Sequence, residues 1–420
     1  MKASRSCPLV LSSVLFLAVA LSAAAESPLV AEGFDRAVIG HGWRTQRRHG
    51  WPAGRLVEGD AAAGEGCYRL RSGAIERTET VPAKPFHYYR IRFAARAAKK
   101  GQRAYWFVYF YDADGREITS DHYGGFYLDT AWQAYEYVFM ARAGSVSMRL
   151  GFGCHADRSR PGLRRVPVDL DAVRLEHSSK EAALAWMDAF AEDLPPLKYE
   201  PAGDRHRFLP QTMRRLREGG ELTVLMLGDS ICNDTSNSMF QLLLERRYPG
   251  ARVRLIHSQR GGTGCRYYQH ARGFDRYVKP YEPDLLVIAG ISHGRDVRAI
   301  RRVIRKARRQ QPELEVLVMT GAVHEPGLSK DMMLRGVRDV PPKQRAAAMK
   351  EIEAFHQRLL AAGAEDAFAV FHMRRVYEDY IAAAPHDRHW FMRDLIHANA
   401  RGKQVLGRIL ERYFQPAAEP

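Results

Sequence analysis

The arrangement most able to do chemistry begins at Ser230, in the segment Gly228-Asp229-Ser230-Ile231. The apolar residues 225–227 before it predict the end of a strand, and a helix is expected after it, with Asn233 or Asp234 as N-cap. A serine at such a turn has its N–H near a helix N-terminus, where developing negative charge is stabilised. Because a serine hydroxyl alone is a poor nucleophile, Ser230 needs a base that takes its proton.

A base for that serine is present near the C-terminus, in Asp394-Leu395-Ile396-His397. A carboxylate and an imidazole three residues apart, on a turn that enters a helix, can lie side by side. Asp394 would then hold the Nδ1–H of His397 and leave Nε2 facing Ser230. We therefore predict a catalytic triad in which Ser230 attacks, His397 relays the proton and Asp394 orients the imidazole.

The C-terminal half has the alternating strands and helices that could position these residues. Continuous apolar runs predict strands at 222–227, 253–256, 285–289, 316–320 and 368–371. Helices are expected at 235–247, 297–310, 344–362 and after residue 398. This pattern predicts a doubly wound α/β domain around a parallel sheet. Such sheets bind ligands at the carboxyl ends of their strands, which is where Ser230 stands.

The N-terminal half has a different rhythm, with short β-rich runs separated by turn residues. Examples are 88–93, 105–111, 134–139 and 147–150. The spacing predicts an antiparallel, all-β sandwich of jelly-roll type. Its last strand, 168–175, resembles the closing strand of galactose-binding-like, carbohydrate-binding sandwich modules.

Aromatic side chains in the run 105–111 could stack on sugar rings. They are Tyr105, Trp106, Tyr109 and Tyr111. Because side chains alternate between the two faces of a strand, at least half of them are expected to lie in the core instead.

The two chemical motifs, taken together, resemble the first and last signature blocks of the SGNH (GDSL-like) hydrolases. The resemblance covers residues 221–414, roughly half of the chain. It implies a flavodoxin-like catalytic domain that hydrolyses esters through an acyl-serine intermediate. It also implies a glycine after the second strand whose N–H donates to the oxyanion, and Gly262 aligns best with that glycine.

The third block of the family departs from the pattern. The family has Gly-x-Asn-Asp there, and this chain has Gly290-Ile291-Ser292-His293. Ser292 or His293 could supply the third oxyanion donor in place of the asparagine side chain. Alternatively, the oxyanion hole has two donors, and His293 shapes the pocket.

The first residues are typical of an export signal. Positive charge at Lys2 and Arg5 precedes an apolar run at 8–21 and small residues at 22–25. We therefore expect a secreted or periplasmic protein without stable membrane insertion. The expected division is a signal peptide at 1–25, a sandwich at 26–178, a helical connector at 179–220 and the catalytic domain at 221–416.

Four cysteines follow the signal, and an oxidising compartment favours disulfide bonds between them. Two lie in each half of the chain, so pairing within each half is the simplest of three connectivities. We predict bonds between Cys232 and Cys265, which follow neighbouring strands, and between Cys67 and Cys154.

The formal net charge is +16. For an exported protein this charge favours an acidic polysaccharide or another cell-surface polyanion over nucleic acid as partner. Much of the excess lies on the predicted helix 297–310, whose basic face is either a solvated surface or a binding patch. No histidine or cysteine spacing predicts a metal site, and no organic cofactor is implied.

The resemblance to the SGNH hydrolases, together with a sandwich that resembles carbohydrate-binding modules, implies a carboxylic ester hydrolase similar to carbohydrate acetylesterases. Its expected substrate is an O-acetylated extracellular polysaccharide. Two alternatives stay open: an O-acetyltransferase that passes the acyl group to a sugar, and a non-catalytic carbohydrate-binding protein.

Overall fold

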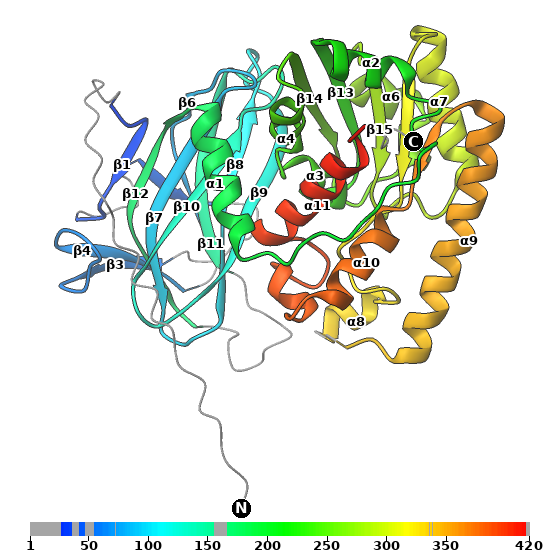
Figure 1. The fold of residues 1–420 in the computed structure, drawn as a ribbon. Coiled ribbons are helices and arrows are strands. Elements are labelled where there is room, and N and C mark those ends of the chain that lie inside the picture. Colours follow the sequence, from blue (N-terminus) through cyan, green and yellow to red (C-terminus); the bar gives the residue numbers. More distant parts are fainter. Residues whose placement is uncertain are drawn as a thin grey trace, which may run out of the picture.

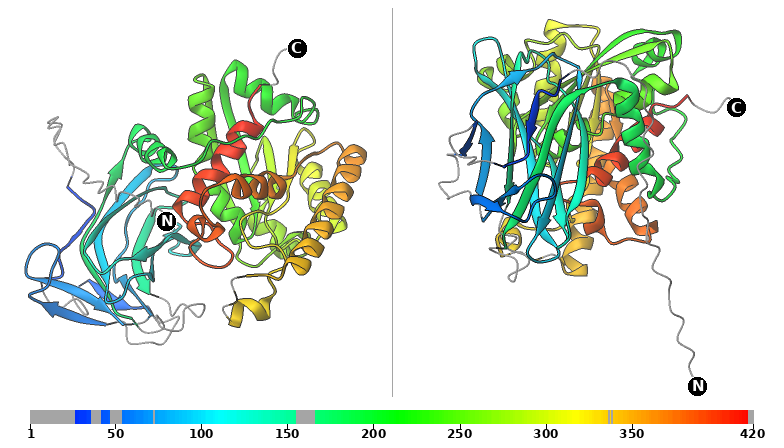
Figure 2. Two further views of the ribbon diagram at one scale, coloured as in Figure 1. Left: turned by 60° about the horizontal axis from the view of Figure 1, so that its bottom comes forward. Right: turned by 90° about the vertical axis from the view of Figure 1, so that its left-hand side faces the viewer.

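The structure is a computed structural model that describes residues 27–35, 42–46, 54–71, 73–154, 166–335, 337 and 339–416. The predicted signal peptide at 1–25 lies outside these ranges. Figure 1 and the left view of Figure 2 show two parts side by side, a β-sandwich and an α/β part.

Two antiparallel sheets form the sandwich. The first has the order β10 (Gln133–Met140), β7 (Tyr88–Ala97), β12 (Val168–Ser178), β4 (Gly66–Leu70), β3 (Gly54–Glu58), with β1 (Val30–Glu32) also on β12. The second has the order β2 (Trp43–Thr45), β5 (Gly73–Arg77), β11 (Ser147–Cys154), β8 (Gln102–Tyr111), β9 (Glu117–Leu128), with β6 (Val81–Pro82) also on β11. Buried residues alternate with half-buried or exposed ones along β7, as a strand with one face on a core requires. The predicted all-β sandwich is confirmed.

The aromatic side chains of β8 are buried on both faces. Trp106 lies in the core between the two sheets. Tyr105 and Tyr109 lie on the other face of the second sheet, in a small cluster with Phe107, and both are about nine-tenths buried or more. Tyr111 is half-buried beside them. The expectation that at least half would be core residues therefore holds, and none of the four is an exposed platform.

A parallel sheet forms the centre of the α/β part. Its order is β14 (Ala251–Gln259), β13 (Gly220–Gly228), β15 (Leu285–Ala289), β16 (Glu315–Met319), β17 (Ala369–Phe371). In chain order this is 2-1-3-4-5, the flavodoxin-like doubly wound arrangement. Each predicted strand is present, because continuous apolar runs suit strands that are buried on both faces.

Helices cover both faces of this sheet. One face packs against α2 (Pro210–Glu218), α4 (Phe240–Arg247), α10 (Met373–Ala383) and α11 (Ala400–Tyr413). The other packs against α5 (Cys265–Tyr268), α6 (Ala271–Tyr277), α7 (Val297–Gln310) and α9 (Pro342–Asp366). The apolar side of α7 is buried and its arginines face outward, as its amphipathic pattern predicts.

The helix expected at 235–247 is in fact two helices, α3 (Ser230–Ser236) and α4. The chain breaks between them at Met239, which has a left-handed φ of 57°. The N-cap of α3 is Asp229, so the assignment of Asn233 or Asp234 is wrong. The physical reason is that the Asp229 carboxylate accepts the N–H groups of Ile231 and Cys232, which starts the helix at Ser230.

The sandwich and the α/β part are joined through α1 (Lys180–Glu192). Its residues Ala183 and Met187 pack against Val138 of β10 and against Leu242 and Leu243 of α4. The views in Figure 2 agree with this placement. The helix therefore connects the two parts by a shared apolar contact as well as by the chain.

The predicted disulfide bonds are wrong, since all four cysteines carry free, buried thiols. Cys232 packs with Met226 of β13, whereas Cys265 packs with Leu225 of the same strand. Neighbouring strand residues point to opposite faces, so the sheet separates these two thiols.

The alternation of side chains between the two faces of a strand also separates Cys67 from Cys154. Cys154 faces the sandwich core, where Tyr68 also points, so the preceding Cys67 points away from that core. Burial raises the pKa of Cys67 to about 11 and that of Cys154 to about 12, which keeps both thiols protonated.

Within the described residues, no helix is both long and apolar enough to cross a membrane.

Candidate active site

Ser230 lies at the carboxyl end of β13, the first strand of the parallel sheet in chain order, where the chain turns into α3. Its side chain is half-buried. Asp229, directly before it, is buried and caps the helix. The turn therefore presents the Ser230 hydroxyl at the sheet edge where doubly wound folds bind ligands.

A short hairpin-like loop carries Asp394 and His397. It is closed by an antiparallel bridge between Met392 and Ala398 and by a 3.0 Å hydrogen bond from the Arg393 N–H to the His397 carbonyl. Within the loop, the Asp394 carboxylate accepts the N–H groups of Ile396 and His397, both at 2.9 Å. The carboxylate therefore shapes the loop that also carries the imidazole.

The structure brings the three predicted triad residues together. The Nδ1 atom of His397 lies 2.9 Å from Asp394 Oδ2, and its Nε2 atom lies 2.9 Å from Ser230 Oγ. The side chains of His397 and Asp394 are 17% and 20% exposed. This chain of hydrogen bonds has the geometry in which a histidine takes the proton of a serine.

The charge of Asp394 is held by its surroundings. Burial acts to raise the pKa of this carboxyl, but the His397 imidazole and the guanidinium groups of Arg103 and Arg393 outweigh it. The pKa of Asp394 is therefore well below its ordinary value, and the group is a carboxylate at neutral pH.

Two backbone N–H groups beside the serine make no hydrogen bond within the described residues. They belong to Ser230 and Gly262, the latter at a left-handed φ of 64° in an exposed turn. The two turns leave adjacent strands, and the Arg260 N–H donates to the Gly228 carbonyl at 3.0 Å. Unpaired N–H groups at this place are the kind of donor that stabilises an oxyanion.

Of the two alternatives for the third donor, the hydrogen bonds of Ser292 and His293 favour an oxyanion hole with two donors. The Ser292 hydroxyl donates to Asp229 at 2.6 Å. In His293, Nε2–H donates to the Ala289 carbonyl and Nδ1 accepts the Cys265 N–H. Burial lowers the pKa of His293 although the Asp229 charge opposes it, so the ring stays neutral. Neither side chain therefore has an O–H or N–H group free to donate to a substrate.

Asp229 thus has a role that the sequence pattern did not reveal. One oxygen accepts the helix N–H groups, and the other accepts the N–H groups of Ile291 and Ser292 at 2.8 and 2.7 Å. The carboxylate joins the Ser230 turn to the loop after β15. Gly290 makes this possible, since it turns the chain at a left-handed φ of 115°.

Replacing Gly290 with alanine is expected to damage the site. The new Cβ would collide with the Asp229 carboxylate, and the backbone angle disfavours a side chain. We expect a loss of about 1–3 kcal/mol in the free energy of unfolding. If Ser230 is the nucleophile that the sequence predicts, displacement of its turn should lower kcat for ester hydrolysis on the order of 10²-fold. Urea unfolding and ester hydrolysis measure the two effects.

Gly203→Ala is the matched control, because a Cβ there meets no atom within 4 Å. Equal behaviour of the two variants would show that the Asp229 link does not position Ser230.

A buried carboxylate, that of Asp234, connects the loop that carries His397 to the helix that carries Ser230. Asp234 of α3 accepts the Ala398 N–H at 2.9 Å. It also lies 3.5 Å from the Arg393 guanidinium and 3.9 Å from the Lys403 ammonium. The helix that carries Ser230 and the loop that carries His397 are therefore tied together by one side chain.

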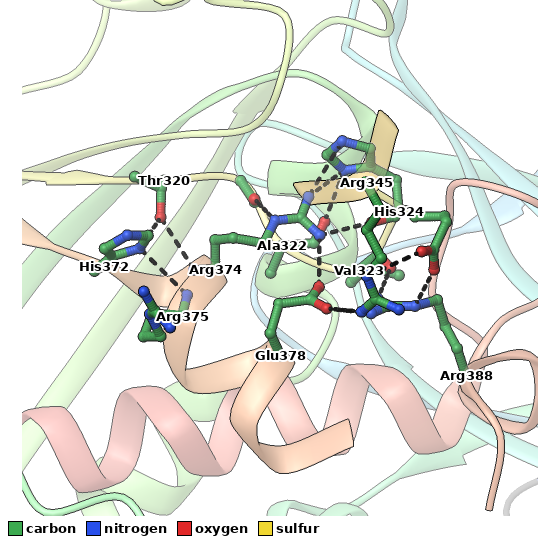
Figure 3. Close-up of polar contacts among 12 residues, drawn as sticks. Thr320, Ala322, Val323, His324, Arg345, His372, Arg374, Arg375, Glu378 and Arg388 are labelled. Carbon is green, nitrogen blue, oxygen red and sulfur yellow. Dashed lines mark hydrogen bonds and ion pairs between the residues drawn. The ribbon is translucent and has the colours of Figure 1, made fainter. Parts of the chain in front are cut away.

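A second buried network holds the short 3₁₀ helix η3 (Arg388–Phe391), which leads into the loop. Figure 3 shows Arg374 and Arg388 on either side of Glu378, beside the segment that follows β16. Arg388 bonds to Glu378 and lies 2.6 Å from Glu325, while Arg374 donates to Glu378 at 3.1 Å. Both guanidinium groups also donate to backbone carbonyls, those of Gly321, Val323 and His324.

The histidine in this network is neutral. Burial and the charges of Arg374 and Arg388 hold the pKa of His324 well below its ordinary value, and its Nδ1 accepts a hydrogen bond from Arg374. Within the described ranges, no group of three or more metal-ligating side chains is found.

Sequence reasoning missed the residues that support the triad. Arg393 and Asp234 lie close to the motifs in sequence, and their charge beside a catalytic pattern is a signal that could have been used. Arg103 comes from the sandwich, and nothing in its local sequence indicates a contact with Asp394.

No protein-family profile matches the chain, and no curated protein matches it. Among similar solved structures, the protein YXIM of Bacillus subtilis has 14% identity and a TM-score of 0.31, with 92% of this chain and 93% of that chain covered. The xylan-binding domain CBM22-1 of Paenibacillus barcinonensis Xyn10C has 12% identity and a TM-score of 0.29, with 37% and 97% covered. The family 22 carbohydrate-binding module of Clostridium thermocellum Xyn10B has 11% identity and a TM-score of 0.28, with 36% and 95% covered.

Proposed function

We propose that this protein is a serine esterase. The observation that carries the proposal is the hydrogen-bonded chain from Ser230 through His397 to Asp394, placed at the carboxyl edge of a doubly wound sheet. The resemblance of both motifs to the SGNH hydrolases supports the same reading. The division into a sandwich at 26–178, a connector at 179–220 and a catalytic domain at 221–416 is part of the proposal.

In the proposed reaction, Ser230 Oγ attacks the ester carbonyl while His397 Nε2 takes the hydroxyl proton. Asp394 holds the imidazole and stabilises its positive charge. The N–H groups of Ser230 and Gly262 stabilise the oxyanion. The alcohol leaves with the proton from His397, and a water molecule, activated by the same imidazole, releases the acid from the serine.

The proposed substrate is an O-acetylated polysaccharide outside the cytoplasm. Support comes from the export signal expected at 1–25 and from a β-sandwich beside the site. Similar solved structures include carbohydrate-binding modules, and we propose polysaccharide binding for this sandwich as well.

A direct test combines turnover with covalent labelling. The protein should hydrolyse a chromogenic acetate ester, and a fluorophosphonate should inactivate it and be found on Ser230 by peptide mass spectrometry. Acetate release from an acetylated polysaccharide without a sugar acceptor would identify a hydrolase. Transfer only to an added sugar would identify the O-acetyltransferase. Label on another residue, or none, would contradict the proposal.

A second candidate is a carbohydrate-binding protein without catalysis. The observation that favours it is that Ser292 and His293 are both engaged in internal hydrogen bonds, which leaves two backbone donors for an oxyanion. Polysaccharide binding with no turnover of any acetate ester would select this candidate.

Salt is expected to lower kcat/KM on an acidic polysaccharide and to leave it unchanged on a small neutral ester. The chain carries a formal charge of +16, which would attract a polysaccharide that bears uronate or sulfate groups. The Debye length falls from about 10 Å at 0.1 M salt to about 3 Å at 1 M. We expect kcat/KM on an acetylated acidic polysaccharide to fall over this range, while a small neutral acetate ester is unaffected. Equal responses of both substrates would favour a neutral glycan.

A further inference from the structure

One side chain of the β-sandwich reaches the loop of the proposed triad. Arg103, in β8, places its Nη2 atom 3.7 Å from Asp394 Oδ2 and is 16% exposed. Its Nε–H is buried and has no hydrogen-bond partner within the described residues. Because burying a guanidinium with an unpaired N–H costs stability, the fold alone gives no reason for a charge here.

The backbone of the sandwich also lies against the loop. Gly125 of β9 is the neighbour of Tyr105 in the pairing of β8 with β9. A Cβ at Gly125 would lie 2.7 Å from the Cβ of Arg393, the residue before Asp394. The second sheet of the sandwich therefore packs directly on the loop, and the approach of Arg103 to Asp394 is part of that packing.

Two kinds of group surround the Asp394 carboxylate: groups that hydrogen-bond to it directly, and guanidinium groups that face it from a slightly longer distance. His397 and the backbone N–H groups of the loop contact the carboxylate directly, and Arg393 and Arg103 face the same oxygen at 3.6 and 3.7 Å. Arg393 also faces Asp234 at 3.5 Å, so two carboxylates share its charge. Asp394 is the one carboxylate paired with Arg103 among the described residues.

We propose that Arg103 is a positioning residue, supplied by the β-sandwich, which sets the charge and orientation of Asp394 and makes the sandwich part of the active site. The inference rests on the proposed esterase function. Arg103 does not touch the reacting atoms. It acts through Asp394, and through Asp394 on His397.

The loss of the Arg103 charge is expected to move the acid limb of the kcat/KM profile in one direction. A positive charge beside Asp394 offsets part of the attraction between this carboxylate and a protonated imidazole. Without Arg103, the carboxylate attracts protons more strongly, and the imidazole keeps its proton up to a higher pH. The acid limb of the kcat/KM profile should then move to higher pH, by about 0.3–1 unit.

The test compares Arg103→Gln, which has a shorter polar side chain and no charge, with Arg103→Lys, which keeps the charge. Arg149→Gln is the control, because Arg149 lies on the same sheet with 19% exposure and contacts Tyr111 and Glu76. We expect the acid limb to move in Arg103→Gln and to return in Arg103→Lys. Plateau kcat should fall less than about 10-fold in Arg103→Gln, and Arg149→Gln should match the wild type.

A second measurement does not depend on activity. The His397 Nδ1 proton should give a downfield imidazole resonance in the proton NMR spectrum, identified by its loss in His397→Ala. Its titration should move to higher pH in Arg103→Gln and stay in place in Arg149→Gln.

An unmoved resonance together with an unmoved acid limb, in a folded Arg103→Gln protein, would overturn the proposal for Arg103. A wild-type protein that hydrolyses no ester would overturn the esterase function instead, and the resonance would still decide the role of Arg103. If Arg103→Gln does not fold, an altered acid limb in a folded Arg103→Lys protein would count against a role of the charge.

Discussion

Replacement of Ser230 or His397 with alanine is expected to lower kcat for a small acetate ester by on the order of 10⁴-fold or more. In the proposed mechanism, the Ser230 hydroxyl and the His397 Nε2 atom, 2.9 Å apart, act as one unit, so that the loss of either removes nucleophilic attack. The double variant should be little worse than either single one. Asp394→Asn should cost less, since the imidazole stays in place.

The control for this experiment is a check that the variants are folded. Ser230 is half-buried and its hydroxyl contacts the imidazole, so Ser230→Ala leaves no large cavity and should melt near the wild-type temperature. A folded Ser230→Ala protein that retains wild-type turnover would refute the triad.

Replacement of Glu378 with glutamine is expected to cause the largest loss of stability. Glu378 lies between the buried guanidinium groups of Arg374 and Arg388, and Arg345 donates to the same carboxylate at 2.7 Å. Removing one partner of a buried ion pair leaves charge without compensation and typically costs 3–5 kcal/mol, as an order of magnitude. Because η3 precedes the loop of Asp394 and His397, kcat should fall as well.

Glu378 is also expected to make the free energy of unfolding depend on pH. Burial acts to raise the pKa of Glu378, but Arg388 and Arg374 outweigh it and lower the pKa below its ordinary value. Its stabilising contribution is therefore complete above the unfolded pKa of about 4.3 and is lost as the pH falls through the folded value. Urea unfolding between pH 3 and 7 should show this acid loss in the wild type and a smaller one in Glu378→Gln.

Glu365→Gln is the matched control for this second experiment. Glu365 pairs with Arg301 at 3.0 Å, but its side chain is 64% exposed, and such surface pairs contribute about 0–1 kcal/mol. If both glutamine variants unfolded at the same urea concentration, the buried network would not support the loop.

The sequence predicted those parts of the fold that depend on local patterns. The strands of the parallel sheet were found because both of their faces are apolar, and α7 was found because its apolar residues recur at helical spacing. The start of α3 was missed because Asp229 competes with two nearby candidates for the N-cap, and the choice depends on the bend after β13.

The remaining errors concern contacts between residues that are far apart in the sequence. The prediction of a bond between Cys232 and Cys265 used the nearness of two strand ends and not the side of the sheet to which each thiol points. The third donor was assigned by position in a motif, whereas Ser292 and His293 are engaged by Asp229, Ala289 and Cys265. The contact of Arg103 with Asp394 joins residues of two separate folding patterns, and no local feature indicates it.

The position of the triad loop along the chain has a consequence for the protein during its synthesis. Ser230 and His397 are 167 residues apart in the sequence, and α11 follows the loop that carries His397. A growing polypeptide therefore contains Ser230 long before it contains His397. The same holds for a chain cut by a protease ahead of residue 394. Such fragments lack the imidazole that the proposed mechanism needs, so the proposed activity requires a chain that extends beyond His397.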